Sequence, residues 1–223
     1  MMQIAIYDMD RTITRHGTYA GWLLFFARRA KPWRLALLPF SLLYGLLYLV
    51  GAVSRGRLKE LNQALLMGRA ADAARVAKLA DDYAARVLAQ ECYADAIVQI
   101  ASDRVAGRRI LLATASYAFY AEAIARRLGI ADVVATRSQL DARGRIRARI
   151  DGANCYGGAK LDMVKAYLQT AGLDRAAIRV WAYSDHHSDL PLLDFADERV
   201  AINPTTTLRG VARGRGWQIV DWS

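Results

Sequence analysis

The hydrophobic pattern divides the chain into a helical first half and a second half in which strands and helices alternate. The apolar run at residues 3–8 ends in an acidic residue, which predicts a short buried strand. From residue 17 to about 104 the pattern is helical, with apolar residues such as Val76, Leu79 and Tyr83 three or four positions apart. We expect no strand in that region.

Strands and helices alternate after residue 107. Strands are expected at 108–116, 131–136, 178–185, 199–204 and 217–222. Helices are expected at 117–129, 158–170 and 189–196, and a hairpin at 137–152 turning near 141–144. Such alternation predicts an α/β fold with a Rossmann-like, mostly parallel sheet. If the first strand joins this sheet, residues 1–15 and 105–223 form the core and residues 16–104 form an inserted helical cap.

Composition narrows the choice of partners. The 223 residues carry a formal net charge of +10, which attracts anions such as nucleic acid, acidic lipids or phosphorylated metabolites. We expect no nucleic acid partner, because no interleaving of basic and aromatic residues indicates a binding module. Cys92 and Cys155 lack the spacing of a metal site, and we expect both to be reduced. Asp8 and Asp10 interrupt any apolar leader, so we expect a cytoplasmic protein.

Polar residues gather where the predicted parallel strands end, which is where such sheets place their sites. They are Asp8, Asp10, Thr114, Lys160, Asp185 and Asp189. Neighbouring carboxylates are tolerated around a cation, and hard oxygen ligands suit Mg2+. One Asp can attack phosphorus, a second can transfer protons, and a lysine can neutralise phosphoryl oxygens. This combination predicts hydrolysis of phosphate monoesters.

The run DMDRT at 8–12, the strand-end Thr114, Lys160 and the run SDHHSDLPLL at 184–193 resemble the four motifs of the haloacid dehalogenase (HAD) superfamily of phosphatases. Within it, the chain resembles subfamily IB, the phosphoserine phosphatase-like enzymes, which insert a helical cap after the first motif. The resemblance covers nearly the whole chain.

The resemblance implies a role for each of these residues. Asp8 would be the nucleophile and a Mg2+ ligand, and Asp10 the general acid and base whose carbonyl also contacts the metal. Thr114 would bind the phosphoryl group, and Lys160 would hold both the phosphate and Asp8. Asp185 would complete the metal shell, and Asp189 would support Lys160 or the metal-bound waters.

Two points stay open around these motifs. Ser116 is an alternative to Thr114 as the phosphate-binding hydroxyl, unless it caps the following helix. His186 and His187 are interpreted as loop residues, because adjacent side chains point apart and imidazole is a poor ligand for magnesium.

The cap sequence bears on the substrate. Phosphoserine enzymes of this family use a cap glutamate to meet the substrate's amino group, whereas residues 11–59 contain no Asp or Glu. That segment has nine basic residues: Arg11, Arg15, Arg28, Arg29, Lys31, Arg34, Arg55, Arg57 and Lys59. A basic, apolar cap resembles that of the phosphatidylglycerophosphatase enzymes of the superfamily, and it favours a lipid phosphate such as phosphatidylglycerophosphate. The alternatives are a small soluble phosphate ester of the phosphoserine type, or an idle membrane-associated binding protein.

Residues 35–53 are uncharged and long enough to cross a bilayer. A single crossing would separate Asp8 from Lys160, although both must meet at one phosphate. Pro39 and Gly45 offer places for a helix to break. We expect one or two cap helices, packed partly on the Ala-rich helices and partly exposed toward an anionic membrane at its inner face. The alternative is a wholly buried cap core.

A row of alternating arginines follows the predicted hairpin turn. The members are Arg143, Arg145, Arg147 and Arg149, which a strand would place on one face. The row is either a solvated hairpin face or a second basic contact with lipid phosphates.

Overall fold

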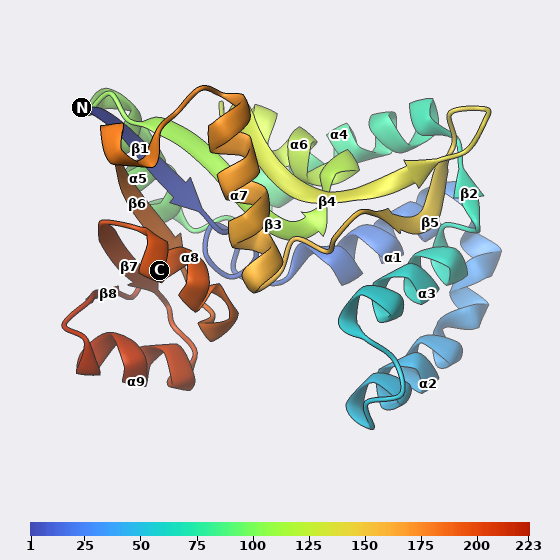
Figure 1. Ribbon diagram of the computed structural model, residues 1–223. Helices are drawn as coiled ribbons and strands as arrows, with labels where there is room; N and C mark the ends of the chain where they lie inside the picture. Colours follow the sequence, from blue (N-terminus) through green and yellow to red (C-terminus); the bar gives the residue numbers. More distant parts are fainter.

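The computed structural model describes all 223 residues, and an eight-stranded sheet runs through its centre (Figure 1). The strands are β1 (Met2–Tyr7), β2 (Ala70–Ala71), β3 (Arg109–Tyr117), β4 (Asp132–Leu140), β5 (Ile146–Asp151), β6 (Ile178–Ser184), β7 (Glu198–Ile202) and β8 (Gln218–Val220). Their order is β2-β5-β4-β3-β1-β6-β7-β8. The strands from β4 to β8 in this order run parallel, while β5 and β2 are antiparallel to their neighbours. The predicted mostly parallel α/β sheet is confirmed.

Helices cover both faces of this sheet. They are α1 (Thr18–Ala30), α2 (Leu38–Leu49), α3 (Arg55–Leu66), α4 (Ala73–Gln90), α5 (Ala94–Val105), α6 (Ala118–Arg127), α7 (Gly158–Thr170), α8 (Leu190–Phe195) and α9 (Thr206–Gly214). Three short 3-10 helices are η1 (Pro32–Leu37), η2 (Arg175–Ala177) and η3 (His187–Asp189).

Alternation along β1 shows how the two layers form. Ala5 and Tyr7 pack with α1, α4, α5 and α6, whereas Ile4 and Ile6 pack with α7, α8 and α9. Because successive side chains of a strand point to opposite faces, a central strand covered on both sides is apolar throughout. Because Asp8 directly follows this buried strand, it lies at the carboxyl edge of the sheet.

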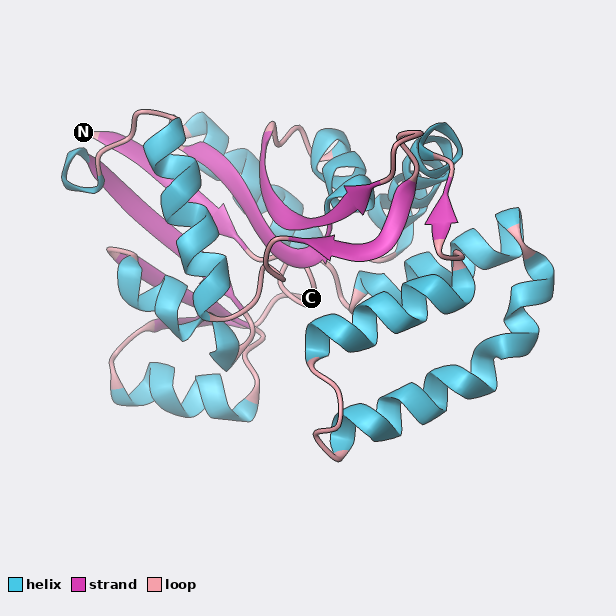
Figure 2. Ribbon diagram, turned by 45° about the vertical axis from the view of Figure 1, so that its right-hand side comes forward, coloured by secondary structure: helices cyan, strands magenta, loops and turns pink.

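The predicted cap, residues 16–104, does not lie in one place. Although α4 and α5 fall within it, α4 packs against α6 and α5 packs against β3 as part of the helical layer. Residues 32–66, which contain η1, α2 and α3, project from the body, and we call them the projecting unit (Figure 2). The division into a core and a cap therefore stays a proposal, with the projecting unit as its distinct part.

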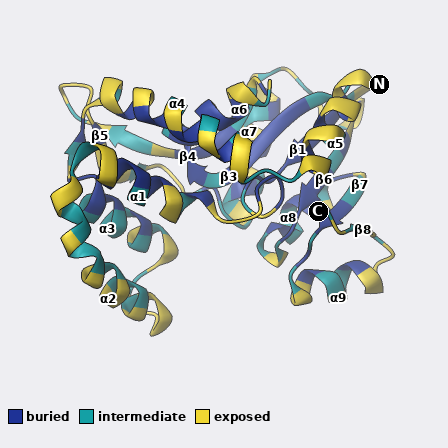
Figure 3. Ribbon diagram, turned by 180° about the vertical axis from the view of Figure 1, so that it is seen from behind, coloured by how far each residue is buried: buried dark blue, intermediate teal, exposed yellow.

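The uncharged segment 35–53 forms η1, α2 and the turn that follows. Pro39 lies in the first turn of α2, where its missing N–H has no intrahelical partner to lose, and Gly45 lies inside the unbroken helix. None of residues 32–49 is buried, so the wholly buried alternative is wrong (Figure 3). The helix packs on α3 and η1, and the expected packing on the Ala-rich helices is also wrong.

Large apolar side chains consequently face outward from this helix. Those that we call the α2 surface are Leu42, Leu43, Leu46, Leu49 and Val50, which are between 50% and 78% exposed.

Three local features differ from the predictions. β2 lies in the region where no strand was expected; two residues are too few to leave a periodic signal. α9 was missed because only Leu208 and Ala212 are buried and two glycines interrupt the pattern. β3 continues to Tyr117 through an irregular register after Thr114.

Candidate active site

Asp8 stands at the carboxyl end of β1, between β3 and β6. Its backbone N–H donates to the carbonyl of Tyr183 at 3.0 Å, which extends the strand pairing to Asp8 itself. Two residues on, Asp10 lines a cavity that Asp8 also lines. Arg11 then adopts a φ of 63°, a left-handed conformation that is uncommon for residues other than glycine and that turns the chain sharply.

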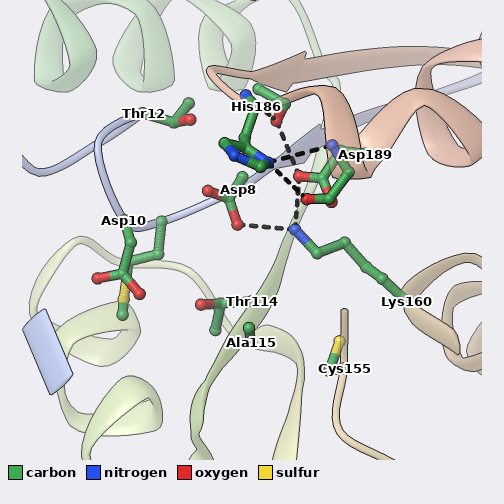
Figure 4. A network of polar contacts seen from close by, with 12 residues as sticks. Asp8, Asp10, Thr12, Thr114, Ala115, Cys155, Lys160, His186 and Asp189 are labelled. Carbon is green, nitrogen blue, oxygen red and sulfur yellow. Dashed lines mark hydrogen bonds and ion pairs between the residues drawn. The ribbon is translucent and has the colours of Figure 1, made fainter. Parts of the chain in front are cut away.

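Lys160 joins two carboxylates at this edge. Its Nζ lies 2.8 Å from Asp8 Oδ1 and 2.7 Å from Asp189 Oδ2 (Figure 4). The Ser184 hydroxyl also donates to Asp189 Oδ2, at 2.8 Å. All four residues are buried. A buried ammonium is tolerated only when it is paired and hydrogen-bonded, so this geometry fixes Lys160 beside Asp8.

Asp185 adds a further buried carboxylate at the end of β6. Burial, with Asp189 nearby, raises its pKa to about 6. Burial also raises the pKa of Asp8, helped by Asp189 and Asp185 and opposed by Lys160. Three buried carboxylates therefore share one ammonium, and this excess of hard, negative oxygen fits a divalent cation such as Mg2+. No three acidic, His or Cys side chains converge tightly enough to form a metal cluster by themselves.

The carboxylate of Asp10 is held by other partners. Its Oδ1 accepts hydrogen bonds from the backbone N–H and the hydroxyl of Thr18 at 2.6 and 2.7 Å, and its Oδ2 accepts one from the Ser116 hydroxyl at 2.7 Å. Thr18 is the first residue of α1, so Asp10 satisfies an unpaired N–H at a helix N-terminus. Tyr120 donates to Ser116 Oγ at 2.7 Å, which directs the serine proton toward Asp10.

The two candidate hydroxyls on β3 differ in their partners. Ser116 contacts Asp10 and does not cap α6, whose first turn has no side-chain cap, so the capping alternative is wrong. Thr114 is fully buried, and its Oγ1 accepts a hydrogen bond from the Ser116 N–H at 3.1 Å. In the close view its side chain lies next to Ala115, below Asp8 and Asp10 (Figure 4).

The rings of His186 and His187 lie against each other, with centroids 4.1 Å apart, so the expectation that they point apart is wrong. His186 Nδ1 accepts a hydrogen bond from the Ser188 N–H at 3.1 Å and so caps η3, while His187 is exposed. Burial lowers the pKa of His186. As expected, neither cysteine forms a disulfide.

Two neighbouring cavities share Asp10 in their linings. The first, of about 600 Å3, opens over Asp8, Asp10, Lys160 and Asp185. The second, of about 350 Å3, we call the side pocket; its lining is Asp10, Tyr19, Tyr48, Arg55, Leu58, Lys59, Asn62, Ala115 and Ser116. Asp10 is the sole carboxylate in this lining, and it also lines the first cavity.

Lys59 is the unusual residue of the side pocket. Its Nζ donates to the carbonyl of Ala115 at 2.5 Å and to Asn154 Oδ1 at 2.8 Å, with no carboxylate in contact. Burial lowers its pKa to about 7. A buried lysine without an anionic partner favours an anion that approaches it.

Sequence reasoning missed several residues of the site. Thr18, Tyr120 and Ser184 were not singled out, and Lys59 was counted only as one basic residue among nine. The Thr18 contact with Asp10 had no capping signal, because Gly17 is the N-cap residue of α1 and Thr18 itself donates to Asp10. The others are brought in by tertiary packing across 56 to 106 residues of sequence or lie one residue before a motif acid.

The fold and this acidic edge together define a Rossmann-like α/β protein in which buried carboxylates surround a lysine at the carboxyl ends of the parallel strands. The model of the haloacid dehalogenase-like hydrolases matches residues 5–194, and the chain belongs to that family. This confirms the family predicted from the four motifs.

Individual relatives refine the comparison. Phosphoserine phosphatase SerB1 of Mycobacterium tuberculosis is 37% identical over 117 residues, covering 52% of this chain and 37% of that protein. The chain thus spans well under two thirds of this relative's length. A solved structure from Bordetella pertussis Tohama I, of unknown function, has 25% identity and a TM-score of 0.87 over 99% of both chains.

A third structure shows the same fold at lower identity. It is a phospho-aspartyl intermediate analogue of phosphoserine phosphatase, with 14% identity and a TM-score of 0.63 over 98% of this chain and 92% of that one. The chain is therefore a HAD-family hydrolase domain with a phosphoserine phosphatase-like fold.

Proposed function

We propose that this protein hydrolyses phosphate monoesters through an aspartyl-phosphate on Asp8. The observation that carries the proposal is the buried contact of Lys160 with both Asp8 and Asp189 at the end of the central parallel strand. Lys160 orients the Asp8 carboxylate and neutralises charge on the phosphoryl oxygens. Mg2+ use and this intermediate are typical of the family.

Each step assigns a bond or a proton to a residue of this chain. Asp8 Oδ attacks phosphorus as the bond to the ester oxygen breaks, and Asp10 gives that oxygen a proton. A water then attacks the aspartyl-phosphate while Asp10 takes a proton from it, releasing phosphate and regenerating Asp8. Thr18 and Ser116 keep Asp10 aimed at the leaving oxygen, and Thr114 binds the phosphoryl group.

A divalent cation would be held by the carboxylates of Asp8 and Asp185 and by the backbone carbonyl of Asp10, with Asp189 supporting Lys160. The carboxylate of Asp10 is excluded from that shell by its bonds to Thr18 and Ser116. When bound, Mg2+ supplies positive charge to the phosphoryl oxygens.

For the substrate, we propose a lipid phosphate such as phosphatidylglycerophosphate. The side pocket next to Asp10 is where a leaving group would lie, and it offers Arg55, Lys59 and the rings of Tyr19 and Tyr48. It holds no carboxylate other than Asp10 to pair with a substrate ammonium. An anionic and partly apolar leaving group complements this lining better than an amino acid does.

Contact with an anionic membrane belongs to the same proposal. Tyr48 of α2 lines the side pocket, so the α2 surface lies on the helix that borders it. Apolar side chains flanked by basic residues favour the surface of an anionic bilayer. The protein would then work in the cytoplasm, peripherally at the inner face of the membrane.

The name of the SerB1 relative favours a second candidate, a soluble phosphate ester such as phosphoserine. Hydrolysis of phosphatidylglycerophosphate in mixed micelles, measured beside phosphoserine with Mg2+, separates the two. We expect a higher kcat/KM for the lipid; a clear preference for phosphoserine would overturn the lipid proposal. A protein that turns over neither these nor a generic aryl phosphate would be the idle, membrane-associated binding protein.

A further inference from the structure

A third cavity, of about 520 Å3, lies on the opposite side of α3 from the side pocket. Its α3 wall consists of Arg57, Glu60, Leu61, Ala64 and Leu65, which recur every three or four residues and so share one helix face. The remaining lining is Arg34, Leu37, Tyr44, Arg69, Arg147, Ala148 and Arg149. We call this cavity the arginine groove.

The charge in the arginine groove is unbalanced. Five arginines line it against one carboxylate, Glu60, which is already occupied: its Oε1 accepts from the Ile150 N–H at 2.9 Å and its Oε2 from Arg57 at 3.0 Å. Neither Arg147 nor Arg149 forms an ion pair within the protein, and both are exposed on alternate positions of β5. Like charges that line one cavity repel one another, and an anion bound among them would relieve this repulsion.

The walls of the groove are fixed by the fold. Gln63 Nε2 donates to the Arg147 carbonyl at 3.3 Å, and Glu60 bonds the same strand at Ile150, so α3 and β5 are joined across the base. Arg34 donates to the carbonyls of Ala64 and Leu65 at 3.0 and 2.7 Å, while its buried Nε has no partner. The guanidinium groups of Arg34 and Arg57 are therefore held in place before any ligand arrives, and Arg147 and Arg149 lie on a strand that is joined to α3.

The alternating arginines between Arg143 and Arg149 have different surroundings in the structure. Arg145 pairs with Asp141 at 2.8 Å within the hairpin turn, whereas Arg147 and Arg149 line the groove. Arg147 and Arg149 are exposed, as the solvated interpretation expects, and in addition they line the groove.

We infer that the arginine groove is a second anion site, which binds the phosphate group of an amphiphilic phosphate ester without hydrolysing it. Guanidinium groups bind phosphate oxygens in pairs, and several can share one phosphate. Leu37, Tyr44 and Leu61 provide apolar contact for the rest of the ligand. The volume is in the range of small-molecule sites. The inference does not depend on the proposed catalysis, because α3 separates the groove from Asp8.

The test follows the nitrogen-15 NMR signals of the backbone amides of residues 147–149 and of the arginine side chains. Three probes are titrated: inorganic phosphate, hexylphosphonate, and vesicles of phosphatidylcholine with or without phosphatidylglycerol. The vesicle arm is read by cosedimentation. The variant is R147Q/R149Q, and the matched control is K78Q/R213Q, which removes the same charge from exposed positions on α4 and α9.

We expect hexylphosphonate to shift the groove signals saturably and to bind more tightly than inorganic phosphate. For the probe that binds the groove, R147Q/R149Q should weaken binding about 30-fold. Each basic residue near an anionic surface contributes roughly a factor of five to the binding constant, and two are removed. K78Q/R213Q should weaken it by less than about 3-fold. If R147Q/R149Q weakens binding to the vesicles, the ligand is a lipid headgroup. If it weakens binding of hexylphosphonate but not of the vesicles, the ligand is a soluble ester.

Two results would overturn the inference. One is the absence of any saturable shift at residues 147–149 with all three probes. The other is an equal loss of binding in the control variant, which would assign the effect to net charge. Thermal unfolding without ligand checks that R147Q/R149Q is folded; relief of repulsion predicts a melting temperature no lower than that of the wild type.

Discussion

The substitution Ser116→Ala tests whether Ser116 positions the carboxylate of Asp10 or binds the phosphate of the substrate. The substitution removes one of the three hydrogen bonds that the Asp10 carboxylate accepts and leaves the two from Thr18. A hydrogen bond to a charged group contributes about 1.5–3 kcal/mol, so we expect the proton transfers that Asp10 performs to slow about 10- to 100-fold. Tyr120 keeps a second hydroxyl contact, with Thr18 at 3.3 Å, so the fold should persist.

The assay is stopped-flow hydrolysis of p-nitrophenyl phosphate with Mg2+. Because p-nitrophenolate leaves without a proton, formation of the aspartyl-phosphate should stay fast, while its hydrolysis requires Asp10 as a base. Ser116→Ala should therefore show a burst of about one equivalent of nitrophenolate per chain, followed by a slow steady state with little change in KM. The matched control is Ser102→Ala, at an exposed position of α5, which should leave the kinetics unchanged. A large rise in KM without a burst would refute this reasoning and would assign Ser116 to phosphate binding in place of Thr114.

Three further substitutions test other parts of the account. Lys160→Met leaves the buried carboxylates of Asp8 and Asp189 unpaired, and urea unfolding should show a loss of about 3–5 kcal/mol at neutral pH; an unchanged midpoint would contradict the buried pairing. Burial lowers the pKa of Lys59 from 10.5 to about 7, so between these values the unfolded chain binds the extra proton and stability rises with pH. The free energy of unfolding of the wild type relative to Lys59→Met should thus increase by up to about 1.4 kcal/mol per pH unit from pH 7 to 9, and a constant difference would argue against a neutral Lys59. Leu46→Asp with Leu49→Asp changes exposed positions, so stability should move by less than about 0.5 kcal/mol while binding to phosphatidylglycerol vesicles falls; retained binding would remove α2 from the membrane proposal.

The sheet and the motif acids were predictable because each leaves a local signal. A buried parallel strand is an apolar run, and the residue after it lies at the carboxyl edge whatever the rest of the chain does. Asp8 and Asp185 could therefore be placed near one another from strand ends alone, whereas Lys160 was placed by its position at the start of the helix before β6. The family resemblance added their roles, which spacing does not provide.

The packing of the first half could not be read in the same way. Periodicity identifies an amphipathic helix but not the surface that it covers, so it could not show that α4 packs against α6 and α5 against β3. The segment 35–53 is apolar on all sides, and no pattern distinguishes a buried helix of that kind from an exposed one. Contacts such as Lys59 with Ala115, or Ser116 with Asp10, depend on tertiary packing and appear only in the structure.

The most direct test of the account is to trap the phosphorylated enzyme. Wild-type protein is mixed with excess p-nitrophenyl phosphate and Mg2+, quenched in acid within the steady state, digested and examined by mass spectrometry. The account predicts one phosphoryl group on the peptide that contains Asp8, and neither phosphorylation nor turnover in Asp8→Asn. Turnover that continues in Asp8→Asn, or a phosphoryl group on any other residue, would contradict it.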